Sequence, residues 1–425
     1  MISKNDFISY FKTGIKNDNE CGIGIEHEKF IFNNNKRINY KSVLLLFTKL
    51  YEFGWKPIIE NENVIALKKG SKNITLEPGN QIELSGEKLK NIHQTCSESQ
   101  EYIFELSQSL KKLDFNIISS GFDPVSKIEE VPSNPKNRYE LMTKIMPLFG
   151  KLSLDMMYRT CGTQINIDYI SEEDFSKKFF VVNRLSPITI ALFANSGIVE
   201  KNKSGYLSYR SHVWQNTYRG GLPKIFLEKM TFEKYADFIL NYPMLFIKRN
   251  DKYLDTKNKT FQNFLDGEIE NVFPNEDDIG DHLSTIFTEN RLKKYIEIRS
   301  MDACGWDCLC AGPAFFIGLL YGNLDEVFDL VKRWNINDIT SAYKDAPKNG
   351  LKTILGNKSI LRWSKNLLDI STRGLQNRNE LNSKKQNEVK FLNHIKTIIN
   401  SNSTNAEEII TKYLKDKNFF TIHEK

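Results

Sequence analysis

Residues 21–30 read CGIGIEHEKF, and this stretch decides the fold class. Its apolar residues Ile23 and Ile25 alternate with polar positions, which is the pattern of a strand with one buried face. Glu26 and Glu28 are two positions apart and point to the same side, where each raises the cost of ionising the other. The stretch therefore predicts a strand whose second face carries paired carboxylates.

Three further stretches repeat this alternation: residues 74–86 (ITLEPGNQIELSG), residues 161–168 (CGTQINID) and residues 295–302 (YIEIRSMD). Pro78 and Gly79 predict a bend or bulge in the first of them. Their polar positions are Glu77, Gln81, Glu83, Gln164, Asn166, Asp168, Glu297 and Arg299. If the four strands pair, the sheet has one aliphatic face and one face rich in carboxylates and amides.

The ordinary alternative is that these positions form the solvent face of an antiparallel sheet. Such a face usually mixes Thr, Lys, Ser and Arg, and it avoids like charges opposite one another because they destabilise pairing. Oxygen-bearing side chains dominate here instead. The pattern therefore favours a functional acidic face.

The remaining periodicity predicts an α+β fold on a largely antiparallel sheet, because strands and helices do not alternate strictly. Strands are expected at 22–32, 73–84, 115–122, 161–169 and 293–300, and helices at 93–113, at 175–196 with a bend at Pro187, and at 311–321. After about residue 325 the chain becomes mostly helical, with amphipathic segments at 383–400 and 405–417. We expect one domain over residues 1–425, with this helical part packed on it.

Composition excludes several classes of protein. The 425 residues are 40% hydrophobic and 26% charged, and 59 basic against 53 acidic residues give a formal charge of +6. No basic stripe or aromatic platform indicates nucleic acid binding, and the longest apolar run, 311–321, is too short to span a bilayer. The first residues lack a secretory signal and contain Asp6, so we expect a cytoplasmic protein whose six cysteines are mostly reduced.

The acidic face predicts a metal. Clustered carboxylates stay ionised when a cation lies among them, and oxygen ligands suit magnesium or manganese. No His and Cys pair at ligand spacing lies near these strands, and CGWDCLC at 304–310 has no second cluster, so zinc is disfavoured. Lys29 and Arg299 are close to the acids in sequence and could neutralise a transferring phosphoryl group. With no GxxxxGK[ST] or GxGxxG element present, a nucleotide would be held mainly through its metals.

Nine motifs in order carry a resemblance to a known family. They are GIEHEKF, LEPGNQIELSG, IHQTC, LDMMYRTCGTQINID, ALFANS, LSYRSHVW, HLSTIF, RLKKYIEIRSMD and PAFFIGLLY, and the similarity around them runs from roughly residue 5 to residue 420. Together they resemble the plant and proteobacterial type of glutamate–cysteine ligase. The resemblance implies a single catalytic domain with a glutamine synthetase-like fold, which joins the γ-carboxylate of L-glutamate to the amino group of L-cysteine through a γ-glutamyl phosphate. It implies ATP as co-substrate and two or three Mg²⁺ ions, with Mn²⁺ as the alternative.

The resemblance also assigns roles to residues. Glu26, Glu28, Glu77, Glu83, Gln164 and Glu297 match metal ligands, and Arg299, Glu297 and Lys29 match catalytic positions. Lys29, Asn166 and Arg299 match the nucleotide side of the site. Arg210 and Arg138 match arginines that hold substrate carboxylates, and Trp214 matches a pocket wall.

Cys96 and Cys310 match a redox-sensitive disulfide of the plant enzymes, and two buried thiols are the open alternative. The family's oligomeric behaviour implies a monomer or a redox-linked homodimer. The sequence departs from the family at Leu245, where a pocket tyrosine is expected, and in lacking a second cysteine pair around residues 252–278. A ligase that joins glutamate to another amine, or a non-catalytic binding protein on the same fold, are the competing interpretations.

Overall fold

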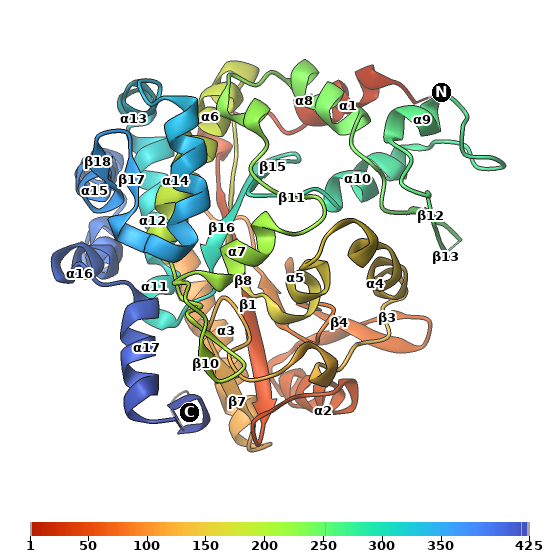
Figure 1. Cartoon of the computed structure of the whole chain (residues 1–425), viewed down its shortest axis with the longest axis horizontal. Helices are drawn as coiled ribbons and strands as arrows, with labels where there is room; N and C mark the ends of the chain where they lie inside the picture. The colour runs from red at the N-terminus through yellow and green to blue at the C-terminus, as the bar shows by residue number, and fades with distance from the viewer. Residues whose placement is uncertain (1, 251, 418, 423–425) are drawn as a thin grey trace.

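One large antiparallel sheet organises the chain (Figure 1). The computed structural model describes residues 2–250, 252–417 and 419–422. Within them the sheet has ten strands, and its main path runs β15, β16, β8, β1, β6, β5, β4, β3, with β2 and β7 also paired to β1. The bounds are β15 Asn290–Leu292, β16 Ile296–Asp302, β8 Gly162–Ile167, β1 Ile23–Asn33, β6 Ile82–Ser85, β5 Lys72–Leu76, β4 Asn63–Lys69, β3 Lys56–Glu60, β2 Lys36–Arg37 and β7 Asn116–Ile118. The prediction of an α+β fold on an antiparallel sheet is confirmed.

The opening stretch is the central strand. β1 pairs with β8 on one side and with β6 on the other, so the four acid-bearing strands are neighbours in the order β16, β8, β1, β6. The register places Glu28 opposite Glu83, and Glu26 opposite Gln164. Side chains alternate along each strand, so the acids gather on one face and the isoleucines on the other.

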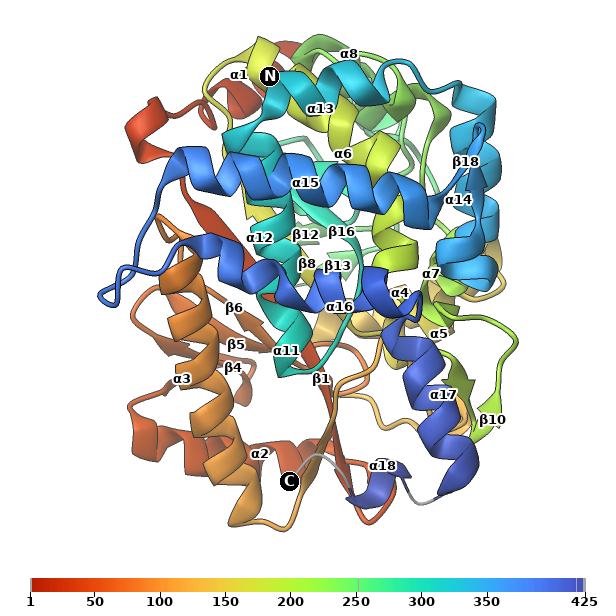
Figure 2. The ribbon, with the colours of Figure 1, turned by 90° about the vertical axis from the view of Figure 1, so that its left-hand side faces the viewer.

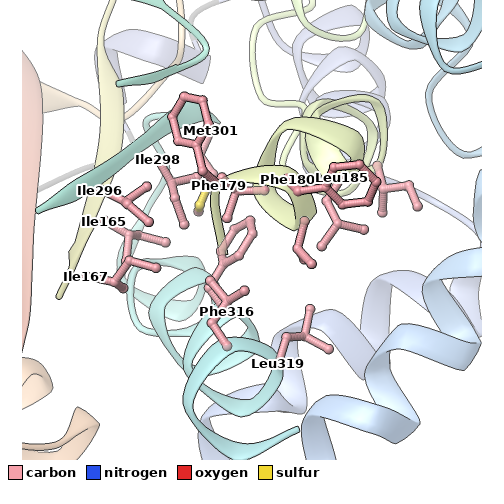
Figure 3. Packing of buried hydrophobic residues seen from close by; sticks show 14 of the residues in the cluster. Ile165, Ile167, Phe179, Phe180, Leu185, Ile296, Ile298, Met301, Phe316 and Leu319 are labelled. Atoms are coloured by element: carbon pink, nitrogen blue, oxygen red, sulfur yellow. The ribbon is translucent and has the colours of Figure 1, made fainter. Parts of the chain in front are cut away.

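The aliphatic face is covered by helices, as Figure 3 shows. Ile165 and Ile167 of β8 and Ile296, Ile298 and Met301 of β16 pack with side chains from α6 (Glu172–Leu192), α12 (Ala311–Ile317) and the π-helical segment η5 (Gly318–Gly322). Nearly every residue of the second half of α6 is buried, because the helix lies between the sheet and the C-terminal helices. This core fixes the position of the polar face behind it.

A second core lies under the other half of the sheet. Ile74 and Leu76 of β5 and Ile82 and Leu84 of β6 pack against α2 (Tyr40–Leu50) and α3 (Ile92–Lys111). Asn39 caps α2 and Asn91 caps α3, each through a side-chain oxygen that accepts a main-chain N–H. Both halves of the sheet therefore bury one face and leave the other for the site.

A third group of helices stands over the polar face. They are α4 (Asn137–Phe149), α5 (Ser153–Arg159) and α7 (Tyr209–Gln215), which contact one another in the order α4, α5, α7. Their shared core contains Tyr139, Met142, Met157 and Trp214 together with Phe246. The candidate site lies where this core meets the sheet.

The C-terminal helices pack on α6 and α12, and Figure 2 shows α12, α15 and α16 stacked on one side of the molecule. They are α13 Leu324–Val331, α14 Ile336–Asn349, α15 Ile360–Arg378 and α16 Asn393–Ser401, and they are followed by α17 Asn405–Lys415 and α18 Phe419–Ile422, which contact each other. Within the described residues no single helix is long and apolar enough to cross a membrane, and the one helix pair that passes together, residues 306–322 with 324–331, is bent by 96°.

The remaining elements border these layers. Helices α1 Lys4–Lys12, α8 Phe232–Leu240, α9 Phe261–Leu265, α10 Glu276–Ser284 and α11 Trp306–Leu309 complete the helical set, with short strand pairs β9 Ile198–Val199 and β10 Asn202–Lys203, β11 Gly220–Gly221 and β14 Phe287–Thr288, β12 Ile247–Arg249 and β13 Lys252–Leu254, and β17 Ile354–Leu355 and β18 Lys358–Ser359. The single-turn segments are η1 Asp18–Glu20, η2 Tyr51–Phe53, η3 Ile128–Glu130, η4 Lys224–Leu227, η6 Gly350–Lys352 and η7 Glu388–Leu392.

Three sequence-based boundaries differ from the structure. The strand expected at 73–84 is two strands joined by a turn at Pro78–Gly79. Of the strand expected at 293–300, residues 296–300 belong to β16 and residues 293–295 form the turn of the β15–β16 hairpin. The helix expected at 175–196 is α6, which begins at Glu172 and ends at Leu192 with Pro187 in its interior. The pair β3–β4 was missed, because Pro57 and the lysines of these strands obscure the alternation.

Candidate active site

The acidic face is assembled by hydrogen bonds between neighbouring strands. Gln164 Nε2 donates to Glu28 Oε1 at 2.5 Å, and the Gly162 N–H donates to Glu28 Oε2 at 2.7 Å. Asn166 Nδ2 donates to Glu26 Oε1 at 2.9 Å. The amides of β8 thus hold the carboxylates of β1 in place through diagonal pairs of paired strands, since Gln164 faces Glu26 and Asn166 faces Gly24.

These carboxyl groups resist ionisation. Burial and the neighbouring Glu77 raise the pKa of Glu28 to about 7. Burial and the Glu26 charge raise the pKa of Glu83 well above its usual range, and burial together with Glu297 raises the pKa of Glu26. The face therefore carries more negative charge than its own surroundings compensate, so a cation bound there would be stabilised.

The donor set fits a hard divalent cation. Gln164 Oε1 and Asn166 Oδ1 are buried acceptors without a hydrogen-bond partner, and they stand beside the carboxylates of Glu26 and Glu28. Among the described residues, however, no three His, Cys, Asp or Glu side chains converge closely enough to hold a metal alone. Mg²⁺ in phosphate-transfer sites is usually bound by one or two carboxylates plus the phosphates, so an oxygen-rich face without a closed cage suits it.

A pocket of about 90 Å³ opens beside this face. Since one water needs about 10–15 Å³ of such space, the pocket accommodates a small polar molecule. Five of the residues predicted from sequence line it: Glu28, Glu77, Arg138, Trp214 and Arg299. They come from β1, the turn before β6, α4, α7 and β16, so the fold brings together residues up to 271 positions apart.

Arg210 was also predicted, but it is not among the residues that line the pocket. The Arg210 guanidinium stands 5.1 Å from the centre of the Trp214 ring and donates to the Arg299 carbonyl at 2.9 Å, and its Nε has no partner. Its charge favours ionisation of Glu28. Arg138 is held by Tyr139, whose hydroxyl accepts from Arg138 Nη2 at 2.9 Å.

Glu297 is surrounded by cations. Arg291 binds it through two hydrogen bonds of 2.9 Å, Lys293 Nζ lies 3.3 Å from Oε2, and Arg299 Nη1 donates to Oε1. Burial opposes ionisation of Glu297, but the charges of Arg291, Lys293 and Arg299 outweigh it and hold the pKa of Glu297 well below its usual range. Glu297 differs in this respect from the other acids of the face.

Lys29 requires a correction. It was assigned to the phosphate side of the site, but its side chain lies on the opposite face of β1 from Glu26 and Glu28, because it is an odd number of residues from both. Its ammonium is buried and donates to Ser119 Oγ at 2.9 Å and to the Cys304 carbonyl at 2.6 Å. Lys29 therefore supports the sheet from behind and does not reach the pocket.

Sequence reasoning missed most of the apolar lining of the pocket. These residues are Pro78, Met142, Met156, Met157, Phe246 and Phe287, and the polar residues Gln81, Tyr139, Thr160, Ser284 and Thr285 complete the wall. Helical spacing in residues 137–159 gives the signal for α4 and α5 but not for the side facing a cavity. Arg291 and Lys293 were also missed, because only the register of the β15–β16 hairpin places them on Glu297.

Comparison with known proteins decides the family. The model of "Glutamate-cysteine ligase family 2 (GCS2)" matches residues 22–418. The chain belongs to this glutamate–cysteine ligase family. Curated relatives include the chloroplastic glutamate–cysteine ligase of Nicotiana tabacum, 36% identical over 97% of this chain and 80% of that protein, and the chloroplastic glutamate–cysteine ligase A of Oryza sativa subsp. indica, 38% identical over 97% and 85%.

Structural comparison supports the fold. A crystal structure of glutamate–cysteine ligase from Francisella tularensis in complex with AMP matches 96% of this chain and 87% of its own, with a TM-score of 0.58 and 13% identity. At that identity the match establishes the shared architecture, and the glutamine synthetase-like fold expected for the glutamate–cysteine ligase family agrees with it.

The names of the relatives overturn one prediction. The expected cytoplasmic location is contradicted, because the curated glutamate–cysteine ligases that match this chain are chloroplastic proteins and point to a plastid. The character of the first residues was an insufficient basis for that expectation.

The cysteines and Leu245 are the positions where the family comparison left questions. The structure joins Cys96 of α3 to Cys310 in a disulfide, with Cα atoms 5.9 Å apart. It also joins Cys304 to Cys308, a pairing that sequence reasoning did not predict. Leu245 is buried in the core beside Trp214 and is not among the residues that line the pocket, whereas its neighbour Phe246 is.

Proposed function

We propose that this protein is an ATP-dependent glutamate–cysteine ligase, which forms γ-glutamylcysteine through a γ-glutamyl phosphate. One observation carries the proposal: Glu28, Glu77, Arg138, Trp214 and Arg299 of a glutamate–cysteine ligase family member line a single pocket on an acidic sheet face. The γ-carboxylate oxygen of glutamate attacks the terminal phosphorus of ATP and releases ADP. The amino nitrogen of cysteine then attacks the acyl carbon, and phosphate leaves.

The acidic face is proposed to hold Mg²⁺ between protein and ATP. Glu26, Glu28, Glu77, Glu83 and Gln164 would be its ligands, supported by their position on one face and by the unpartnered oxygen of Gln164. Bound there, the metal would neutralise charge on the phosphates and on the carboxylate that must approach them. Glu297, the sixth proposed ligand, already has three cationic partners and joins the set only when one of them turns to a phosphate.

The arginines are proposed to bind and orient the substrates. Arg299 lines the pocket and has an unpartnered Nε, so it is placed to stabilise the transferring phosphoryl group. Arg210 and Arg138 would hold the carboxylates of the amino acid substrates, since guanidinium groups match carboxylates in shape and charge. Trp214 would form a wall of the pocket between Arg210 and Arg299, because their guanidinium groups lie 5.1 and 5.3 Å from its ring centre. Asn166 would contact the nucleotide side through its free oxygen.

ADP release by the purified protein tests the function. The reaction contains magnesium, ATP and L-glutamate, and receives L-cysteine, 2-aminobutyrate, glycine or ammonia separately. Cysteine-dependent ADP release is the expected result. Release with another amine alone would reassign the product, and no release with any amine would favour a binding protein. Leu245 is buried and is not among the residues that line the pocket, so it gives no support to a different amine.

A further inference from the structure

The cation cluster around Glu297 divides its arginines into two kinds. Arg291 and Glu297 are directly opposite in the β15–β16 hairpin, and both side chains are buried. Arg291 Nε donates to Glu297 Oε2 and Nη2 donates to Oε1, each at 2.9 Å. This side-by-side geometry fixes the plane of the carboxylate as well as its position.

The third nitrogen of Arg291 is also occupied by the protein. Arg291 Nη1 donates to the carbonyls of Ser284 at 2.6 Å, Ile286 at 3.1 Å and Leu283 at 3.4 Å. Ser284 itself lines the pocket. Every nitrogen of the Arg291 guanidinium therefore has a partner within the protein, and the side chain connects the pocket wall to the strand that carries Glu297.

Arg299 is the opposite case. It donates to Glu297 through Nη1, its Nε is unpartnered and it lines the pocket. Three cations share one carboxylate, so the group keeps a formal charge of +2. Because Arg291 and Lys293 also bind Glu297, Glu297 can orient Arg299 without neutralising it alone, and Arg299 still lines the pocket.

We infer that Arg291 is a positioning residue for the phosphoryl-transfer site: it fixes Glu297, which in turn aims Arg299 at the phosphates of the nucleotide. The inference rests on the proposed function for the identity of the nucleotide, but not for the geometry of the cluster. Arg291 would act without contacting substrate, since its donors are already used. Lysine cannot replace it, because a single ammonium cannot make the paired contact and reach the carbonyls at the same time.

The test is a double-mutant cycle on nucleotide binding. Binding of ADP in the presence of magnesium is measured by calorimetry for wild type, Arg291→Lys, Glu297→Gln and the double variant. We expect each single variant to bind at least about tenfold more weakly, and the double variant to be no more than about twofold weaker than the weaker single, because both remove the same arrangement. Multiplying effects, or Arg291→Lys binding within about twofold of wild type, would overturn the inference.

Arg219→Lys is the matched control. Arg219 is also buried and also binds the pocket wall, donating to the carbonyl of Thr285 at 2.9 Å and to its hydroxyl at 3.0 Å. It makes no hydrogen bond or ion pair with Glu297 in the described part of the chain. Its effect should multiply with that of Glu297→Gln, which separates wall anchoring from positioning of Glu297. If Arg291→Lys lacks the wild-type melting transition, Arg291→Gln takes its place in the cycle.

Turnover is measured alongside to separate the two proposals. Wild-type protein without cysteine-dependent ADP release would contradict the proposed function, while the binding cycle would still decide the role of Arg291. Cysteine-dependent turnover with independent effects in the cycle would retain the function and remove the positioning role.

Discussion

Glu28 makes the stability of the acidic face depend on pH. Its pKa rises from 4.5 to about 7 on folding, because of burial and the Glu77 charge. An acid with a raised folded pKa leaves stability unaffected below the unfolded pKa, lowers it as the unfolded state ionises first, and adds no further change above the folded pKa. We expect Glu28 to lower the free energy of unfolding between about pH 4.5 and pH 7, by at most about 3 kcal/mol.

Thermal melting in EDTA checks this expectation. The difference in melting temperature between wild type and Glu28→Gln should change by several degrees from pH 5 to pH 8, with wild type losing stability relative to the variant. Added magnesium should reduce the difference at pH 8. A difference in melting temperature that stays constant with pH would show that folding does not raise the pKa of Glu28.

Arg210 provides a second test at this scale. Replacement by lysine should raise the KM for glutamate about 10- to 100-fold and change the KM for ATP much less, because a buried charge-assisted contact contributes about 1.5–3 kcal/mol. Steady-state kinetics measure both constants. Arg184→Lys is a suitable control, since Arg184 is buried but donates to the carbonyls of Leu227, Val331 and Trp334. Equal changes in both KM values would argue against a role for Arg210 in glutamate binding.

Residue-level prediction from sequence worked where strand alternation decided the matter. Glu26 and Glu28 share a face because they are two apart, and the same rule places Lys29 on the other face, although similarity to a family motif had assigned it to the site. Arg291 could not be found in this way. Its role depends on a hairpin turn that sets its register against Glu297, and the periodicity of residues 293–300 suggested a continuous strand instead.

At the level of elements, the Cys96–Cys310 disulfide ties α3 to the start of α12. A bond that closes a loop of 214 residues restricts the unfolded chain, and such bonds typically contribute about 2–4 kcal/mol. We expect reductant to lower the melting temperature of the wild-type protein, and Cys96→Ser to remove most of this response. Cys304→Ser is the control, because the Cys304–Cys308 loop is short.

The same variants test the predicted association state. Size-exclusion chromatography with and without reductant should show a change between monomer and dimer in the wild type if the predicted redox-linked homodimer forms, and no change in Cys96→Ser. If the elution volume of the wild type is that of a monomer with and without reductant, the predicted homodimer does not form.

Elements were predicted well where one face is buried and poorly elsewhere. The acid-bearing strands were found because isoleucine alternates with polar residues in each. The strand β3 lies at the end of the sheet, is partly exposed and contains Pro57, which an edge strand tolerates, so its sequence gave no clear period.

For the whole molecule, we propose a single catalytic domain that includes the C-terminal helices. Tyr343 of α14 donates to Glu289 Oε1 at 2.6 Å, and the charges of Arg210 and Arg299 favour ionisation of this Glu289. The Pro347 carbonyl at the end of α14 accepts from the main-chain N–H groups of Leu207 and Ser208, just before α7. A chain truncated after residue 324 should therefore lose its cooperative melting transition and its ADP binding. Limited proteolysis of the intact chain is the complementary measurement. A stable fragment ending near residue 325 would establish a separate C-terminal domain.

The fold class could be predicted from sequence because four amphipathic strands leave few arrangements that bury their aliphatic faces. The pocket could not, since it forms between layers that come from different parts of the chain. Trp214 of α7 and Arg138 of α4 line the same pocket because α5 contacts both of their helices. Similarity to the family motifs identified these two residues, but only the packing of the helices brings them to the same pocket.

The central position of β1 has a consequence for the synthesis of the chain on the ribosome. The strand leaves the exit tunnel long before its neighbour β8, which follows more than 130 residues later, and β16 follows β8 by a similar length. Contacts of such long range form slowly, so nascent chains hold the isoleucine face of β1 uncovered while most of the protein is still being translated. Chaperone attachment to this growing polypeptide should be strongest before β8 emerges to pair with the strand.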